Sequence, residues 1–531
     1  MRSAVLAAAV CCLAPTIAVG QIAPVAPIEQ TALARDAFST GLLDRNEGAL
    51  DSDLWRGSDA QTIAALMAAL PDKPASPAIG AAFRRLLLSQ GETPLGSTAS
   101  LGGRKLSALI TAGFVDEART IDSLSAGGGR DATSIEAMAI GGLLVGERED
   151  ACAKARGIGA AGDSAFWVKL RVVCYAVANE LDAAELALGI LKENLWIGER
   201  ETPIFALLAA GARPDTPFEA TSAVEYAAIE ALGAPYSFST LERGSAGVVK
   251  ALARNAGVDW AMRLAAARRA AAMGVMSGNE LRKIYSENGE NAAAFHRIRA
   301  LTAPEFMRDK SAAIFEELRL NNDFESLFAT ALLYADDLRE LEGLLVPIEH
   351  AQLFSLARLA VGDPVGAERW LGAISPDEIK GAPESEAMRF IDLVGILAIL
   401  EPTGAARLAS LANISVAAPR FAEREMAQAS ADLALLVSSA IAAAADGRKG
   451  ESALAALAAS SYAATGDPIA EAVVTQAFAA AGMDDIVKRR AVERAIASLY
   501  PVTSATLPST VAPAKSVAPG LTPRLKPDQS S

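Results

Sequence analysis

The sequence predicts an all-α protein, built as an α-solenoid of antiparallel helical hairpins. Half of the 531 residues are apolar but only 5% are aromatic, so Ala and Leu, both strong helix formers, supply most of the apolar content. No sustained alternation of β-branched residues predicts a sheet. A turn-and-helix pattern also recurs at a fixed interval between residues 113 and 191.

The recurring pattern consists of a turn residue and an alanine five positions later. The three pairs are Gly113 and Ala118, Gly146 and Ala151, and Asn179 and Ala184. Successive turn residues are 33 positions apart, and each follows an apolar helical run. Gly and Asn accept the left-handed backbone that ends a helix, and an alanine in the next helix lets two helices approach closely. The pattern therefore predicts a helical hairpin; chance spacing in an Ala-rich helical chain is the alternative.

Two later turns resemble these. Gly362 precedes Ala367 by the same interval, and Gly466, followed by Asp and Pro, copies the turn that begins at Gly362. A hairpin of this kind cannot bury its apolar face alone, so we expect the hairpins to stack on one another.

This spacing resembles the tetratricopeptide class of repeats, in which a Gly and an Ala of the turn region are also five apart. Tyr175, four positions before the third turn, falls where that class places an aromatic residue. The Trp and small-residue positions of the first helix are mostly unmatched, and the terminal Pro is absent. The resemblance covers about three hairpins and implies a right-handed solenoid. It assigns no functional residue.

The N-terminus has the pattern of a secretion signal. Arg2 precedes an apolar run from Ala4 to Ala18, and Ala18-Val19-Gly20 forms a small-x-small cleavage site. Cys11 and Cys12 raise the alternative of a lipoprotein, but Val10 stands where such a signal needs a small residue. We therefore predict export across the inner membrane, to the periplasm. No later stretch reaches about 18 apolar residues, so no membrane span is expected.

The remaining chain divides by composition. The predicted segments are a signal peptide (1–20), a mobile lead-in (21–34), an N-terminal helical-repeat region (35–288, with regular hairpins at about 104–195), a C-terminal helical-repeat region (289–499) and a disordered Pro/Ser/Thr/Ala-rich tail (500–531). The polar stretch 286–291 contains Asn-Gly and marks the boundary between the two helical regions. The tail cannot bury enough surface to fold. It is expected to be a linker, or else a short extended ligand for a partner or for the acidic body.

Helices are expected where apolar runs lie between turn residues. The main ranges are 35–43, 59–70, 78–89, 106–112, 135–145, 166–178, 218–232, 248–256, 260–273, 278–285, 311–320, 324–334, 338–345, 352–360, 365–371, 470–481 and 484–499.

Two cysteines, Cys152 and Cys174, remain after the predicted cleavage. In an exported protein an even pair suggests a disulfide. In the repeat frame the two lie on neighbouring helices of successive hairpins, so a bridge would join two repeats. Two buried free thiols are the alternative.

The charge and the residue types favour few kinds of chemistry. The formal net charge is −14, and an acidic chain without a basic cluster does not favour nucleic acid binding. The two histidines, His296 and His350, accompany no nucleophile motif, and no metal-ligand spacing or phosphate-binding loop occurs. We predict no catalytic residue, cofactor or metal.

The resulting functional prediction is an envelope scaffold or adaptor that binds a protein or peptide partner through a helical-repeat surface. The alternative is a cell-wall glycan-processing enzyme or accessory factor, with a carboxylate in the superhelix groove. A desolvated acid pair would favour the enzyme, whereas a groove lined by Asn, Arg and aromatic residues would favour the adaptor.

Overall fold

A computed structural model describes residues 36–500, except 126–130, 288–291, 417, 420–430 and 464–466. The predicted signal peptide and lead-in, and the predicted tail beyond Tyr500, lie outside these residues, as does Gly466. The described residues all belong to one compact unit.

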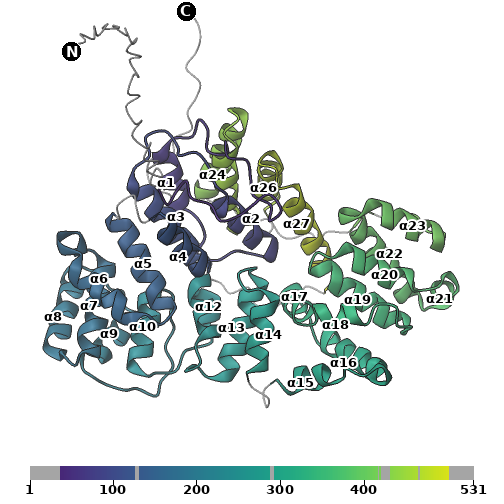
Figure 1. Cartoon of the computed structure of the whole chain (residues 1–531), viewed down its shortest axis with the longest axis horizontal. Coiled ribbons are helices and arrows are strands. Elements are labelled where there is room, and N and C mark those ends of the chain that lie inside the picture. The colour runs from purple at the N-terminus through teal and green to yellow at the C-terminus, as the bar shows by residue number, and fades with distance from the viewer. Residues whose placement is uncertain are drawn as a thin grey trace, which may run out of the picture. The chain divides into compact units, whose positions relative to one another are not determined.

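The regular secondary structure of the described residues is helical apart from two isolated bridges, which confirms the all-α fold class (Figure 1). Their helices are α1 (Ala60–Ala68), α2 (Pro77–Leu88), α3 (Ala99–Thr111), α4 (Val115–Leu124), α5 (Ala132–Leu144), α6 (Arg148–Gly157), α7 (Ala165–Val177), α8 (Leu181–Glu193), α9 (Thr202–Ala209), α10 (Ala223–Leu232), α11 (Ser239–Arg243), α12 (Ala246–Arg254), α13 (Trp260–Ala272), α14 (Gly278–Ser286), α15 (Ala293–Ala300), α16 (Met307–Arg319), α17 (Phe324–Leu333), α18 (Ala335–Glu340), α19 (Ile348–Ala360), α20 (Pro364–Gly372), α21 (Pro376–Gly381), α22 (Glu384–Leu400), α23 (Pro402–Ala412), α24 (Ala431–Ala445), α25 (Lys449–Ala463), α26 (Pro468–Ala480) and α27 (Asp484–Ala497). Two isolated β-bridges, Asp59 with Leu95 and Phe218 with Tyr236, are the only strand pairing in this part of the chain. None of the described helices has the length and apolarity that a membrane crossing requires.

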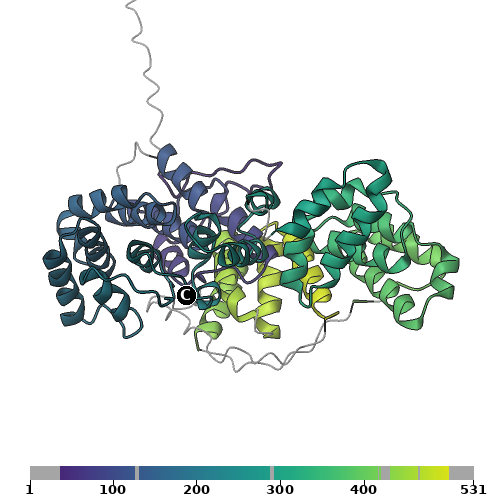
Figure 2. The same ribbon diagram turned by 90° about the horizontal axis from the view of Figure 1, so that it is seen from below.

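Helices that follow one another in the sequence pack side by side (Figure 2). The pairs include α3 with α4, α5 with α6, α7 with α8, α12 with α13, α19 with α20, α22 with α23, α24 with α25 and α26 with α27. Helices of successive pairs also pack, for example α3 against α5 and α19 against α22. The helices of these pairs thus pack against neighbours that are close in the sequence.

The three predicted turns between α3 and α8 share one backbone geometry. Gly113, Gly146 and Asn179 have φ values of +92°, +82° and +60°. In each turn the next residue donates its N–H to the carbonyl five positions earlier, as Glu147 does to Gly142 at 2.8 Å. This bond closes the helix end and reverses the chain, and it needs the left-handed backbone that Gly and Asn tolerate. Gly362, at +78°, has the same bond, from Asp363 to Arg358.

The alanines five positions after these turns are completely buried. Ala118, Ala151, Ala184 and Ala367 each have 0% of their surface exposed. Each is in the first turn of the second helix of its pair, where a larger side chain would push the two helices apart. The spacing therefore has a packing explanation.

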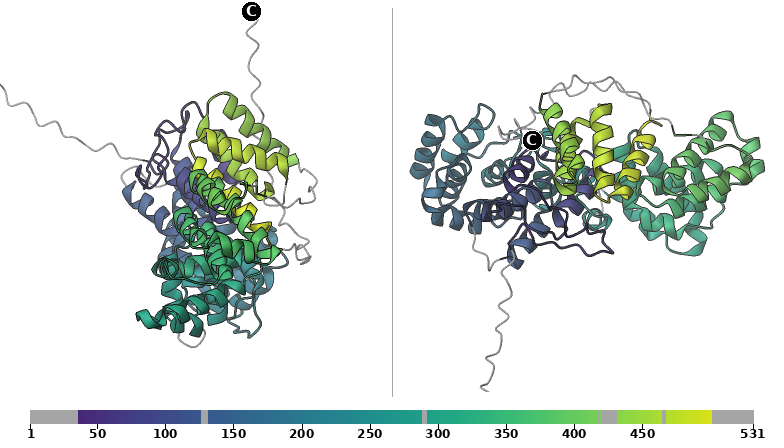
Figure 3. Two further views of the ribbon diagram at one scale, coloured as in Figure 1. Left: turned by 90° about the vertical axis from the view of Figure 1, so that its right-hand side faces the viewer. Right: turned by 90° about the horizontal axis from the view of Figure 1, so that it is seen from above.

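The last helices of the chain pack on the first ones (Figure 3). α25 contacts α1 and α2, and α27 contacts α2 as well as α22. The Gly450 N–H donates to the Leu54 carbonyl at 2.9 Å, and Arg85 of α2 pairs with Asp485 of α27. These contacts join segments that are about 400 residues apart.

The helix predicted at 35–43 is wrong. Asp36 instead accepts the N–H groups of Phe38 and Ser39 through its carboxylate, which forms a local turn. The chain then extends, and the N–H of Leu42 donates to the carbonyl of Leu88 at 2.8 Å, at the end of α2. Asp36 thus caps a single turn, with the same bonds by which Asp259 caps α13, and the extended segment that bonds Leu88 takes the place of the predicted helix.

Candidate partner-binding surface

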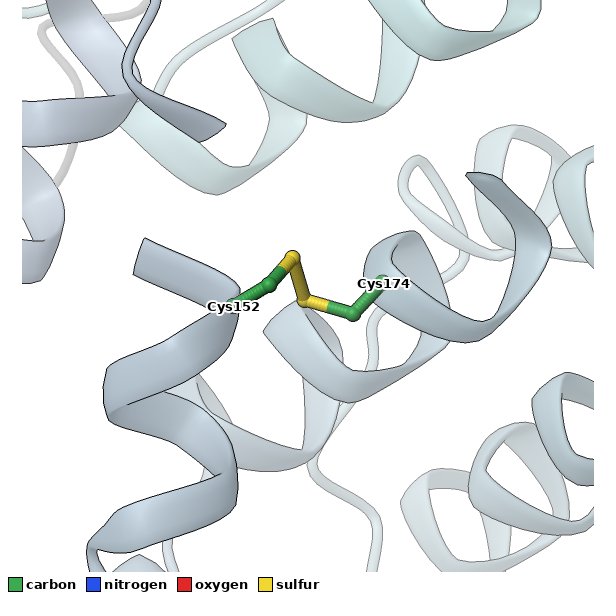
Figure 4. Close-up of a disulfide and its surroundings, with 2 residues drawn as sticks. All are labelled: Cys152 and Cys174. Carbon is green, nitrogen blue, oxygen red and sulfur yellow. A yellow bond between two sulfur atoms is a disulfide. The ribbon is translucent and has the colours of Figure 1, made fainter. Parts of the chain in front are cut away.

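Cys152 of α6 and Cys174 of α7 are joined by a disulfide in the structure (Figure 4). Their Cα atoms are 5.7 Å apart, and only 7% of Cys152 is exposed. The bridge joins the second helix of one pair to the first helix of the next pair, and it closes a loop across 22 positions. Its place in the fold is structural: it fixes α6 against α7.

The predicted turn residues do not form a common site. Gly113, Gly146, Asn179 and Gly362 each end a different helix, and the alanines paired with them are buried inside different helix pairs. They determine the hairpin geometry, and among them only Asn179 carries a polar side chain.

A carboxyl group with a strongly raised pKa belongs to Glu493 of α27. Burial raises its pKa to about 7, although hydrogen bonds from Ser76 and from the Ala78 N–H and the charges of two nearby arginines favour its ionised form. The Ala78 N–H lies 2.7 Å from its Oε1 atom, at the start of α2. Glu493 therefore caps a distant helix.

A second carboxyl with a raised pKa lies elsewhere. Burial raises the pKa of Glu136 on α5, whose carboxylate accepts a hydrogen bond from the Trp167 indole. Glu136 and Glu493 lie on helices that do not pair, so they do not form the desolvated acid pair that would favour glycan cleavage. In the described part of the chain, no group of three His, Cys, Asp or Glu side chains could hold a metal ion.

The two histidines lie among aromatic side chains. The ring of His350 stacks on Phe315 with 3.9 Å between centroids, and burial lowers its pKa. His296 packs against Phe295, and its Nε2 atom lies 3.1 Å from the Tyr285 carbonyl oxygen. Both imidazole rings thus contact aromatic side chains.

An Arg, Asn and aromatic cluster does occur, but it lies mostly in the interior. The Arg268 guanidinium of α13 lies 3.4 Å from the Tyr285 hydroxyl, 3.2 Å from Asn321 Oδ1 and 3.1 Å from Thr330 Oγ1. Tyr285 and Thr330 are only 8% and 2% exposed. These contacts connect α13 and α14 to α17 across the predicted boundary at 286–291, so their role is packing.

The outward side of α8 differs from these interior sites. Its inner side buries Ala184, Ala187, Leu188 and Leu191 against α7 and α9. The opposite side holds a shallow, open hollow of about 400 Å³. The residues that line the hollow are Asp182, Glu185, Leu186, Gly189, Ile190 and Glu193, and we name these six residues the α8 surface.

The α8 surface combines exposed aliphatic and acidic side chains. Leu186 is 70% exposed and Ile190 is 39% exposed, and they stand one helical turn apart. A Cβ atom added at Gly189, between them, would meet no atom within 4 Å. Such a surface has room for a second chain to lie close to the helix backbone.

The three carboxylates of the α8 surface have no cationic partner in the described part of the chain. Asp182, Glu185 and Glu193 form none of the ion pairs found there. By contrast, the neighbouring acidic residues Glu201 and Glu225 are bound by Lys169 and Arg200. The charge of the α8 surface is thus left to solvent or to a binding partner.

The turn after α8 carries an unusual residue. Leu195 has φ of +54° and is 89% exposed. It occupies the left-handed position that Gly113, Gly146 and Asn179 occupy in the preceding turns, and the following N–H, of Trp196, again bonds the carbonyl five positions earlier. A bulky residue in this conformation is strained, and an exposed leucine gains no burial in return. The strain points to a role for its side chain outside the fold.

Sequence reasoning did not identify this surface. The signal was present, because Leu186 and Ile190 lie off the apolar stripe formed by positions 184, 187, 188 and 191. Helical periodicity alone did not show which side of α8 would remain uncovered, since that depends on where α7 and α9 pack.

No protein-family model, curated protein or solved structure matches the chain.

Proposed function

We propose that the chain is an exported adaptor that binds a protein or peptide partner through the α8 surface. The single observation that carries the proposal is the open hollow on α8, where exposed Leu186 and Ile190 lie among three carboxylates that form no ion pair with the described residues. In this proposal the packed helix pairs belong to a right-handed, tetratricopeptide-like α-solenoid, an architecture that offers extended surfaces to partners.

The physical basis is the combination of apolar contact with charge. Burying two aliphatic side chains supplies a small apolar centre, and a rim of carboxylates orients a basic partner and speeds its approach. The surface of a single helix is small, so the proposed interaction is a transient one with a peptide segment. Leu195, at the end of the same helix, extends the apolar contact.

A double variant tests the proposal. Leu186→Ser/Ile190→Ser removes the aliphatic side chains from an exposed position and should leave the fold intact. Affinity capture from cross-linked envelopes should recover a partner with the natural chain and lose it with this variant, and the purified partner should then bind the natural chain directly. The matched control is Leu124→Ser on α4, whose leucine is 60% exposed. Equal recovery with all three chains would overturn the proposal.

We also propose that the chain acts in the periplasm. The secretion signal in the sequence and the Cys152–Cys174 disulfide both support an oxidising compartment outside the cytoplasm. A fusion of alkaline phosphatase to the full chain should be active. An inactive fusion, with the protein recovered from the cytoplasm, would contradict the localisation.

A further inference from the structure

We propose that residues 520–527 of this chain are themselves a ligand of the α8 surface. The inference rests on the proposed function, since it names a segment that would compete there with an external partner. The segment has the sequence GLTPRLKP and follows the last described residue, Tyr500, by about twenty positions.

Charge complementarity favours this occupant. Arg524 and Lys526 lie in a stretch that is net positive, although the whole chain carries a formal charge of −14. The α8 surface offers three carboxylates, and no cation of the described residues pairs with them. Two cations placed among three carboxylates relieve the mutual repulsion of those carboxylates. The resulting attraction weakens as the salt concentration rises.

The apolar side chains also correspond. Leu521 precedes the basic residues of the segment and Leu525 lies between them, while Leu186 and Ile190 are the aliphatic side chains of the α8 surface. Gly189 between them leaves the helix backbone open to close approach. Pro523 and Pro527 disfavour a helix, so the proposed bound form of the segment is an extended chain.

A second copy of α8 is a poorer occupant. Two α8 surfaces facing each other would bring six carboxylates together without a cation between them. Like charges placed opposite one another across an interface oppose association. The aliphatic centre of the surface is also too small to offset that repulsion.

Docking of the segment would regulate the adaptor. A tethered ligand competes at an effective concentration that the linker sets, so even a weak contact can occupy the surface until a better ligand displaces it. The partner proposed above would then bind more tightly to a chain that lacks the basic residues at 524 and 526.

Zero-length carbodiimide cross-linking of the full chain tests the inference. This reagent joins a lysine amine to a carboxylate in direct contact. We expect mass spectrometry to find Lys526 joined to Glu185 or Glu193, and the yield to fall about tenfold when Leu186→Ser removes the apolar contact or when salt is raised well above physiological strength. Lys515, eleven positions away in the same tail, is the internal control and should give far less of this product. A mixture of unlabelled and ¹⁵N-labelled chains separates links within a chain from links between chains.

Each outcome has a definite meaning. Absence of the Lys526 product, or a product whose yield ignores Leu186→Ser and salt, would overturn the inference. The proposed function is judged separately by partner capture in the full-length Arg524→Glu/Lys526→Glu variant. Partner capture without the Lys526 cross-link would support the adaptor function and overturn the inference that the tail segment binds the α8 surface. The cross-link without capture makes the α8 surface an internal docking site and overturns the adaptor.

Discussion

The Oε1 atom of Glu493 accepts the Ala78 N–H at 2.7 Å, across 415 positions of sequence. Ala78 is in the first turn of α2, where N–H groups have no partner within the helix. Ser76, the N-cap of α2, satisfies a neighbouring N–H, and Glu493 satisfies this one from α27. A buried carboxyl group thus joins the last described helix, α27, to α2.

This contact predicts a dependence of stability on pH. Burial raises the pKa of Glu493 from 4.5 to about 7. Between these values the folded chain holds a proton that the unfolded chain has released, so the free energy of unfolding falls as the pH rises. The loss attributable to Glu493 is at most about 3 kcal/mol. Chemical denaturation of the natural chain and of Glu493→Gln at several pH values measures it.

The difference in unfolding free energy between the natural chain and Glu493→Gln isolates the contribution of the Glu493 carboxyl group. Glu493→Gln keeps an acceptor for the Ala78 N–H but cannot ionise, so its stability relative to the natural chain should increase from pH 4.5 to 7. Glu149→Gln, at an exposed position of α6, should show no such trend. A constant difference across this pH range would contradict the assignment.

The disulfide should stabilise the fold appreciably. Replacing Cys152 and Cys174 by alanine opens a loop that spans 22 positions, and loss of that constraint should lower the free energy of unfolding by about 3 kcal/mol. Hydrogen exchange should rise first in α6 and α7. Intact-mass analysis provides the check: uptake of two alkyl groups without a reductant would show that the bridge is absent.

The buried alanines predict a steric effect. Ala151 is 0% exposed on α6, so Ala151→Leu should overpack the hairpin and destabilise it by about 1–3 kcal/mol. Ala153→Leu is the matched control on the same helix, because residue 153 is exposed. This variant should change the free energy of unfolding by no more than about 0.5 kcal/mol. Denaturant midpoints of the two variants make the comparison, and equal midpoints would remove the packing explanation of the repeat.

The left-handed backbone of Leu195 leads us to expect that one substitution will stabilise the fold and weaken partner binding. Asn tolerates the left-handed backbone better than Leu, so Leu195→Asn should raise the free energy of unfolding by about 0.5–1 kcal/mol. The same change removes an exposed aliphatic group and should weaken partner capture. Leu124→Asn, at the end of α4, should not gain stability, and a similar gain there would refute the strain argument.

Local features could be predicted from the sequence better than distant ones. The hairpin turns at Gly113, Gly146 and Asn179 follow from a residue type and a spacing, because the left-handed backbone is a local requirement. The stretch 36–43 is helical by composition, and Asp36 caps one turn there, but the next residues bond the Leu88 carbonyl at the end of α2. That contact with a segment more than 40 positions away is not visible in a local pattern.

Contacts between distant helices could not be predicted from sequence patterns. Nothing in the neighbourhood of Glu493 marks Ala78 as its partner, and only packing of α27 on α2 brings them together. The α8 surface was missed for the same reason. Whether Leu186 is covered or exposed depends on the placement of α7 and α9, which the residues of α8 do not encode.

Site-specific photo-cross-linking along α8 tests the central claim most directly. A photoreactive amino acid would replace Leu186 or Glu193 on the α8 surface, and Ala153 on α6 as a control, in the full chain in living cells. The adaptor account predicts one reproducible adduct from the two α8 positions, abolished by Ile190→Ser, and none from position 153. Adducts from all three positions alike, or none from α8, would contradict it.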